Sequence, residues 1–243
     1  LIWWMEQTAT WMENRAWDSV DDYFLYLEEF FDNARQVQLT TSDLSYFMYG
    51  AMLWPTYLAK KHGDPIIRSC WEALASARTP SLSTLDPIIP GGLGTALNEF
   101  GVWNYFTRER SPENTFYPDG PRIGYTLGMD LSMGAYPAEG YLNPVFSASN
   151  YAEFLFARDW KGTDRFRVGF EPTGGRIHQN SIIFFNSAND FRIEKITGSG
   201  SSLTLGKTWN RAVLVTTNIN SSQVGGSYHF RVEHDISSET EAP

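Results

Sequence analysis

The sequence contains one cysteine, Cys70, in 243 residues. A single thiol can form no disulfide within the chain and cannot by itself build a cysteine-based zinc site. Basic residues are also few: 19 Lys and Arg stand against 28 Asp and Glu, which gives a formal net charge of -9. Most of the surface would therefore repel a phosphate backbone or an anionic membrane, and we expect no nucleic-acid partner.

Long hydrophobic runs are missing too, because polar residues interrupt each apolar stretch before the ~18 residues that a membrane span needs. At 42% hydrophobic and 15% aromatic residues, the chain is nevertheless too apolar to be disordered. It opens on Leu1-Ile2 with neither an initiator Met nor a signal-peptide pattern, so we expect a further segment upstream. Many Asn, Ser and Thr with few Lys in the second half favour an extracytoplasmic protein.

The first 110 residues show the period of helices. The first predicted helix spans residues 2–14, and the apolar residues on its broad face are Trp4, Met5, Ala9, Trp11 and Met12. The residues predicted on its polar face are Glu6, Thr10 and Glu13. This spacing predicts a strongly amphipathic helix.

Further helices are predicted from their start and stop residues. Ser19 and Asp22 form a capping-box pattern ahead of a helix that ends near residue 33. Residues 42–62 predict one long helix, kinked by Pro55 and ended by Gly63. Residues 64–78 and 95–107 predict two more helices, of which the first starts at a favourable Asp-Pro pair.

Beyond residue 120 the period changes to two. Residues 166–170, 203–205 and 228–232 alternate apolar with polar residues, as half-buried strands do. Residues 154–157, 182–185 and 212–215 are continuously apolar, which predicts strands buried on both faces. About seven strands are expected, the number typical of a β-sandwich. The sequence therefore predicts an α+β protein of two domains, an all-α helical module over residues 1–120 and an antiparallel β-sandwich over residues 121–243.

Common catalytic signatures are absent from the sequence. The chain has no His-Glu-x-x-His helix and no Gly-x-Ser-x-Gly elbow, and residues 91–94 (Gly-Gly-Leu-Gly) predict a turn and no phosphate loop. We expect ordinary structural or surface roles for the four histidines, which are His62, His178, His229 and His234.

Several blocks of the helical half are nevertheless similar to a known family. These blocks are residues 3–13 (Trp-Trp-Met-Glu-Gln-Thr-Ala-Thr-Trp-Met-Glu), 20–23 (Val-Asp-Asp-Tyr), 26–27 (Tyr-Leu), 49–51 (Tyr-Gly-Ala), 59–63 (Ala-Lys-Lys-His-Gly), 97–100 (Leu-Asn-Glu-Phe) and 103–106 (Trp-Asn-Tyr-Phe). In order and spacing they resemble the rear part of the catalytic domain of secreted bacterial zinc metallopeptidases of the gluzincin group. A β-sandwich often follows this part in such proteins.

The resemblance implies roles for four residues. In gluzincins a Glu on a helix that follows the His-Glu-x-x-His helix is the third zinc ligand, and Glu6 matches it. Thr10 and Glu13, on the same helical stripe, match second-shell or substrate-facing positions. In aminopeptidase-like relatives a Tyr that precedes a Gly stabilises the oxyanion. Tyr49, directly before Gly50, is the candidate here, with Tyr46 beside it and Phe47 three residues before the Gly.

The zinc-binding His-Glu-x-x-His would lie upstream of Glu6 and is not in this sequence. A single carboxylate does not hold zinc, so we expect zinc only together with an upstream segment, and no catalysis by this chain alone. Three functions stay open. The first is a portion of a secreted peptidase that hydrolyses peptides. The second is a structural protein that associates with copies of itself or with a partner. The third is a glycan- or protein-binding module. A binding module would contact its ligand through an exposed aromatic side chain. Trp160 is expected to be exposed at a turn, whereas Trp209 is expected in the core.

Overall fold

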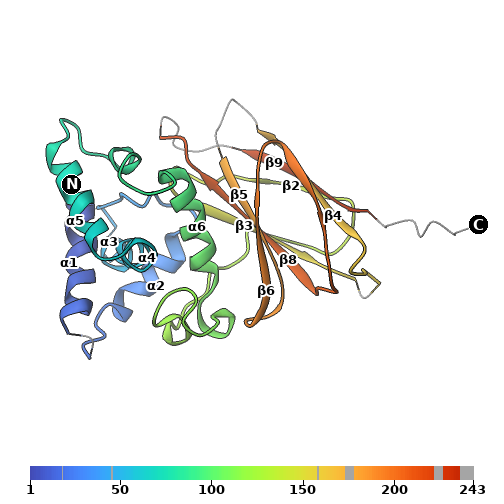
Figure 1. The fold of residues 1–243 in the computed structure, drawn as a ribbon, viewed down its shortest axis with the longest axis horizontal. Helices are drawn as coiled ribbons and strands as arrows, with labels where there is room; N and C mark the ends of the chain where they lie inside the picture. Colours follow the sequence, from blue (N-terminus) through green and yellow to red (C-terminus); the bar gives the residue numbers. More distant parts are fainter. Residues whose placement is uncertain (18, 45, 158, 173–177, 222–226, 236–243) are drawn as a thin grey trace, which may run out of the picture.

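The computed structural model describes residues 1–243 apart from 18, 45, 158, 173–177, 222–226 and 236–243. The predicted α+β class is confirmed: helices gather at one end of the molecule and two β-sheets at the other, with α6 between them (Figure 1). No helix within the described residues is long and apolar enough to cross a membrane.

The described part of the helical half contains six α-helices. They are α1 (Ile2–Ala16), α2 (Phe24–Asn33), α3 (Phe47–Gly50), α4 (Leu53–His62), α5 (Pro65–Ser76) and α6 (Leu93–Tyr105). Short 3-10 helices are η1 (Leu82–Leu85), η2 (Arg108–Arg110) and η3 (Gly120–Arg122). The predicted stop signal at the end of α4 is confirmed, because Gly63 has a positive φ of 85° that favours glycine.

The predicted single helix over residues 42–62 is wrong. The chain forms α3, breaks at Ala51 and Met52, and restarts as α4. Pro55 falls in the first turn of α4, where backbone N–H groups have no partner within the helix, so it favours the new start and causes no kink. Gly50 lies so close to α2 that a Cβ there would meet the Tyr26 carbonyl oxygen at 2.4 Å.

The predicted capping box of Ser19 and Asp22 is also wrong. Helix α2 begins only at Phe24, and no side chain caps its first turn. Tyr23 is instead buried, and its phenol donates a hydrogen bond of 2.9 Å to the carboxylate of Asp119. The start of this helix is therefore held by a contact with a residue far along the chain, and spacing in the sequence cannot indicate such a contact.

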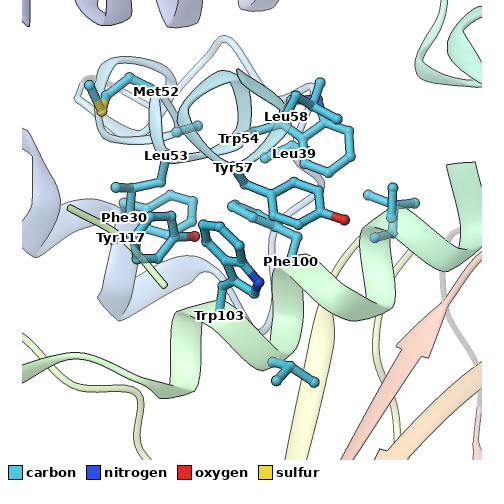
Figure 2. Packing of buried hydrophobic residues seen from close by; sticks show 14 of the residues in the cluster. Phe30, Leu39, Met52, Leu53, Trp54, Tyr57, Leu58, Phe100, Trp103 and Tyr117 are labelled. Carbon is cyan, nitrogen blue, oxygen red and sulfur yellow. The ribbon is translucent and has the colours of Figure 1, made fainter. Parts of the chain in front are cut away.

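Aromatic rings fill the core of the helical half (Figure 2). Trp54 meets Phe100 edge-on with ring centroids 5.2 Å apart, and Tyr57 meets Trp103 edge-on at 4.9 Å. Aromatic pairs of this geometry each add about 0.5–1.5 kcal/mol to the stability gained by burial alone. The pairs join α4 to α6 and hold the small helices together.

Nine strands of the described chain form two sheets. In spatial order, the five-stranded sheet consists of β1 (Leu131–Met133), β3 (Ser149–Leu155), β8 (Arg211–Asn218), β5 (His178–Ser187) and β6 (Asp190–Ile196). The four-stranded sheet consists of β2 (Ala138–Leu142), β9 (Tyr228–Asp235), β4 (Arg165–Pro172) and β7 (Gly200–Thr204). The pairing of β1 with β3 is parallel and the others between these strands are antiparallel.

The alternating strands place their apolar residues between the sheets as predicted. Phe166 and Val168 of β4 and Phe230 of β9 are buried, while Arg167 and Arg231 on the same strands are exposed. A period of two puts successive side chains on opposite faces of a sheet, so this pattern alone fixed which face of β4 and β9 points inward.

Two of the three continuous apolar runs are buried on both faces, also as predicted. In β8, Leu214 belongs to the core between the sheets and Val215 to the core under the helices; in β5, Ile182 and Ile183 divide in the same way. The prediction is wrong for residues 154–157, because β3 ends at Leu155, whose side chain is 45% exposed. Helix α6 does not cover that end of the strand.

Polar groups also cross between α6 and the sheet. The side-chain nitrogen of Asn98 donates hydrogen bonds to the Gln179 backbone carbonyl and the Thr217 hydroxyl, both at 3.0 Å. The Ser181 hydroxyl donates to the side-chain amide oxygen of Asn98 at 2.5 Å. Asn98 is 2% exposed. Helices and sheet therefore share one continuous core, and the division at residue 120 stays a prediction.

Both tryptophans considered for ligand binding are buried. Trp209 packs in the sandwich core, as expected. The exposure predicted for Trp160 is wrong, because the side chain is 2% exposed and its ring stacks on His234 with centroids 3.7 Å apart. His234 in turn contacts the Asp164 carboxylate at 2.8 Å. Phe156 and Tyr136 also contact the Trp160 ring, with centroids 4.3 and 4.7 Å away, so packing with distant residues buries a side chain that lies beside a turn in the sequence.

Candidate functional site

Helix α1 carries Glu6, Thr10 and Glu13, the three candidate residues of the metallopeptidase resemblance. Glu6 is half-buried, Thr10 is buried and Glu13 is exposed, so they do not form the common polar face that was predicted. The Thr10 hydroxyl donates to the backbone carbonyl of Glu6 at 3.0 Å, one helical turn earlier. That bond satisfies the hydroxyl within the helix and does not involve the Glu6 carboxylate.

The apolar face of α1 is also divided differently from the prediction. Trp4 and Trp11 are buried, but Met5 and Met12 are 49% and 55% exposed. Both sets are apolar, and the described part of the chain covers only the tryptophan side, where α3 and α4 pack. Residues of one helix that recur at intervals of three and four lie on one stripe. The exposed stripe of α1 consists of Ile2, Met5, Ala9 and Met12.

A groove runs beside this stripe, between α1 and the start of α5. Its volume is about 820 Å³, and its lining includes Met5, Ala9 and Met12 from α1 and Ile67 and Trp71 from α5. An ion pair closes one side, since Arg15 and Asp64 meet at 2.6 Å. The groove is therefore apolar with a polar edge.

Glu6 and Tyr49 are brought together from separate elements. The negative charge of the Glu6 carboxylate is the main reason why the pKa of Tyr49 is raised above its ordinary value, and burial of the phenol adds to it. A phenolate beside a carboxylate is disfavoured, which raises the pKa of the phenol. Tyr49 lies within α3, which packs against α1, and this packing brings the residue near Glu6.

Three tyrosine rings meet at this place, and we call Tyr26, Tyr46 and Tyr49 the tyrosine platform. Tyr26 lies 5.4 Å from Tyr46 and 5.3 Å from Tyr49, and the latter two are 6.5 Å apart, all between ring centroids. Tyr46 is 52% exposed and the other two are half-buried. Tyr49 and Tyr46 were considered from the sequence as candidates for the oxyanion tyrosine. Tyr26, on α2, belonged to a block of the family resemblance but was given no role.

Glu13 lies at a second, smaller hollow. Its side chain and those of Asn14, Trp17 and Asp22 line a space of about 220 Å³ where α1 ends. Glu13 is two turns away from Glu6 along the helix, a separation of about 10 Å at 1.5 Å per residue. Thr10 lines the same hollow, so Thr10 and Glu13 lie together there, apart from Glu6 and Tyr49.

The residues present do not make a zinc site. In the described ranges, no three His, Cys, Asp or Glu side chains come together in a group that could hold a metal ion. Zinc takes four ligands in structural sites, and three with water in catalytic sites. The histidines of the described chain lie in α4, β5 and β9, and His229 is paired with Glu171 on the outer face of a sheet. Glu6 alone does not fit zinc.

Comparisons with known proteins give little support to any assignment. No family model matches the chain, and no curated protein sequence matches it. Among solved structures, the pre-peptidase C-terminal domain of a collagenase from Bacillus anthracis has a TM-score of 0.33 and 8% sequence identity. The match covers 45% of this chain and 100% of that domain. So slight a similarity assigns neither a fold family nor an activity.

Proposed function

We propose that this chain is the C-terminal portion of a secreted zinc-metallopeptidase-like protein of the gluzincin type. In this proposal Glu6 is one zinc ligand, and a segment upstream supplies the His-Glu-x-x-His helix. The observation that carries the proposal is the place of Glu6: a half-buried carboxylate beside the Tyr49 phenol, on a helix whose neighbouring stripe is apolar and exposed.

The exposed stripe of α1 suits a further helix. Packed helices lie with their axes 8–10 Å apart and bury side chains at intervals of three and four, which is the spacing of Ile2, Met5, Ala9 and Met12. A helix on this stripe would run within side-chain reach of Glu6, and carboxylate oxygens bind zinc at about 2.0–2.2 Å. The groove towards α5 would be covered by the same addition.

Zinc bound by Glu6 and two histidines would activate water for hydrolysis of a peptide substrate. Because this chain holds one ligand of the set, we derive no step from it. In this proposal the Glu6 carboxylate is the zinc ligand that the chain contributes. The nearby Tyr49 phenol can donate a hydrogen bond beside that ligand. The secreted location follows from the same proposal.

The test is zinc binding by a polypeptide that includes the upstream segment. We expect one zinc per chain by elemental analysis, and loss of zinc from the Glu6→Gln variant. Glu13→Gln, an exposed carboxylate of the same helix, is the matched control and should keep its zinc. An upstream segment without His-Glu-x-x-His, or equal zinc contents in the wild type and the Glu6→Gln variant, would refute the proposal.

A second candidate is an assembly protein that uses a peptidase-like scaffold without its metal. It is favoured by the distribution of apolar surface: of ten large hydrophobic side chains exposed in the described residues, eight lie in residues 1–46. Sedimentation of the chain at increasing concentration would show stable oligomers, which the paired changes Met5→Lys and Met12→Lys would dissociate. A chain that stays monomeric at high concentration excludes this candidate.

A further inference from the structure

The tyrosine platform is an exposed aromatic surface within an acidic part of the molecule. We propose that it binds the positively charged side chain of a lysine or arginine in a peptide. This inference goes beyond the proposed function, because it requires neither zinc nor an upstream segment.

The spacing of the rings suits one cation. A cation is attracted by the face of an aromatic ring when it lies within about 6 Å of the ring centroid. The three centroids are 5.3, 5.4 and 6.5 Å apart, so a cation at the platform lies near all three rings. Tyr26 and Tyr46 stack with their planes inclined by 26°, and Tyr49 is tilted by 40° and 51° to them, so the ring most open to a cation is that of Tyr46, which is 52% exposed.

Two carboxylates lie near the tyrosine platform. The Glu29 carboxylate accepts a hydrogen bond of 2.9 Å from the backbone nitrogen of Tyr46. The negative charge of Glu6 acts on the phenol of Tyr49. The attraction of a cation to these two negative charges adds to its attraction to the ring faces.

The charge of the wider region has the same sign. Residues 1–59 contain nine Asp and Glu, two Arg and no Lys. Both arginines are paired elsewhere, Arg15 with Asp64 at 2.6 Å and Arg35 with Asp130 at 2.7 Å. Most of the net charge of -9 therefore belongs to this quarter of the sequence. Such a field attracts cationic peptides and repels anionic ones.

The chain offers a control for simple aromatic exposure. Tyr141 on β2 is 58% exposed, slightly more than Tyr46, but its ring packs at a tilt against His229, with centroids 4.9 Å apart, and its strand pairs with the strand of Arg231. It is a single tyrosine among side chains of both signs. The inference predicts no cation binding at Tyr141.

The experiment is a titration followed by NMR, with all tyrosines labelled in the ring. The probe is the tripeptide acetyl-Gly-Lys-Gly-amide, and its uncharged counterpart has norleucine in place of lysine. We expect the lysine peptide to shift the signals of Tyr26, Tyr46 and Tyr49, and the norleucine peptide to leave them in place. Added salt should weaken the interaction, because it screens exposed charges.

Variants separate the ring face from the hydroxyl. Tyr46→Ala should weaken lysine-peptide binding about two- to fivefold, the loss of one exposed cation–π contact. Tyr46→Phe keeps the ring and should bind within about twofold of the wild type, and Glu29→Gln should weaken binding and its salt dependence. Tyr141→Ala should change nothing.

Three results would overturn the inference: equal binding of the norleucine peptide, equal weakening by Tyr141→Ala, or no shift of the platform signals up to the solubility limit of the lysine peptide. None of these measurements depends on zinc. If the chain binds the lysine peptide but holds no zinc even when its upstream segment is present, the proposed function is refuted and this inference stands.

Discussion

Asn98 in α6 and Thr217 in β8 are joined by a buried hydrogen bond of 3.0 Å between the amide nitrogen and the hydroxyl oxygen. Ser149 meets the same hydroxyl at 2.7 Å, so the two halves of the molecule are connected through satisfied polar groups as well as through apolar contacts. We infer that the helices and the five-stranded sheet unfold together.

Asn98→Ala tests this connection. The change removes the Asn98 amide from the Ser181 hydroxyl and the Gln179 carbonyl, while Thr217 keeps its hydrogen bond with Ser149. Unsatisfied buried polar groups cost about 1–3 kcal/mol each. We expect a loss of about 2–4 kcal/mol in the free energy of unfolding, measured in urea by both tryptophan fluorescence and circular dichroism. Both signals should still change together. Asn143→Ala, at an exposed position, is the control, and two separate transitions in the wild type would contradict the inference.

Gly101→Ala tests the close approach of α6 to the sheet. A Cβ at Gly101 would lie 2.2 Å from the Ser149 hydroxyl oxygen, whereas a Cβ at Gly169 would meet nothing within 4 Å. Alanine is favoured over glycine in a helix by about 1 kcal/mol, so any destabilisation reports the steric contact. We expect Gly101→Ala to cost about 1–3 kcal/mol and Gly169→Ala to change stability by less than about 0.5 kcal/mol. Equal stabilities of the two variants in thermal unfolding would refute the close approach.

Glu99 predicts a dependence of stability on acidic pH. Burial acts to raise the pKa of its carboxyl group, but hydrogen bonds from Lys195, Lys61 and Tyr57 outweigh burial and lower it. A carboxyl whose pKa is lower in the folded protein stabilises the fold above its unfolded pKa, and this contribution disappears as the pH falls through the folded pKa.

We expect urea unfolding of the wild type to show stability falling below about pH 4.5, the ordinary pKa of a Glu side chain, and Glu99→Gln to flatten that fall. Asp130 acts in the opposite sense, because burial raises its pKa despite its contact with Arg35. Its contribution is largest at low pH and declines as the pH rises. Identical pH profiles for the wild type and Glu99→Gln would exclude the role of Glu99.

Tyr49 reports the proximity of Glu6. A neighbouring carboxylate disfavours the phenolate, so Glu6→Gln should lower the pKa of Tyr49 towards its ordinary value of 10.0. The pKa can be followed by NMR of the labelled tyrosine ring during titration with base. Glu13→Gln is expected to leave the pKa of Tyr49 unchanged. An unchanged pKa in Glu6→Gln would mean that the two side chains are not neighbours.

The sequence predicted elements that depend on local pattern. The alternation in β4 and β9 and the double-sided burial of β5 and β8 follow from which residues are apolar at a period of one or two. The same reasoning failed on α1, because Trp4 and Met5 are both apolar and only packing decides which turns inward. The wide apolar surface of this helix allowed either orientation.

The candidate site could be predicted only in part for a similar reason. Glu6 and Tyr49 were each identified, but their proximity depends on the packing of α3 against α1, which no local pattern in the sequence indicates. Tyr26 joins them from α2 through packing that has no local signature. Contacts between distant residues, such as that of Tyr23 with Asp119, are likewise outside the reach of periodicity.

The most direct test of the account is native mass spectrometry of the protein isolated from the organism that makes it, with zinc measured on the same sample. The account predicts a species in which this chain is joined to, or bound by, a segment that carries His-Glu-x-x-His, with about one zinc per complex. Copies of this chain alone, free of zinc, would contradict it and leave the assembly protein as the remaining candidate.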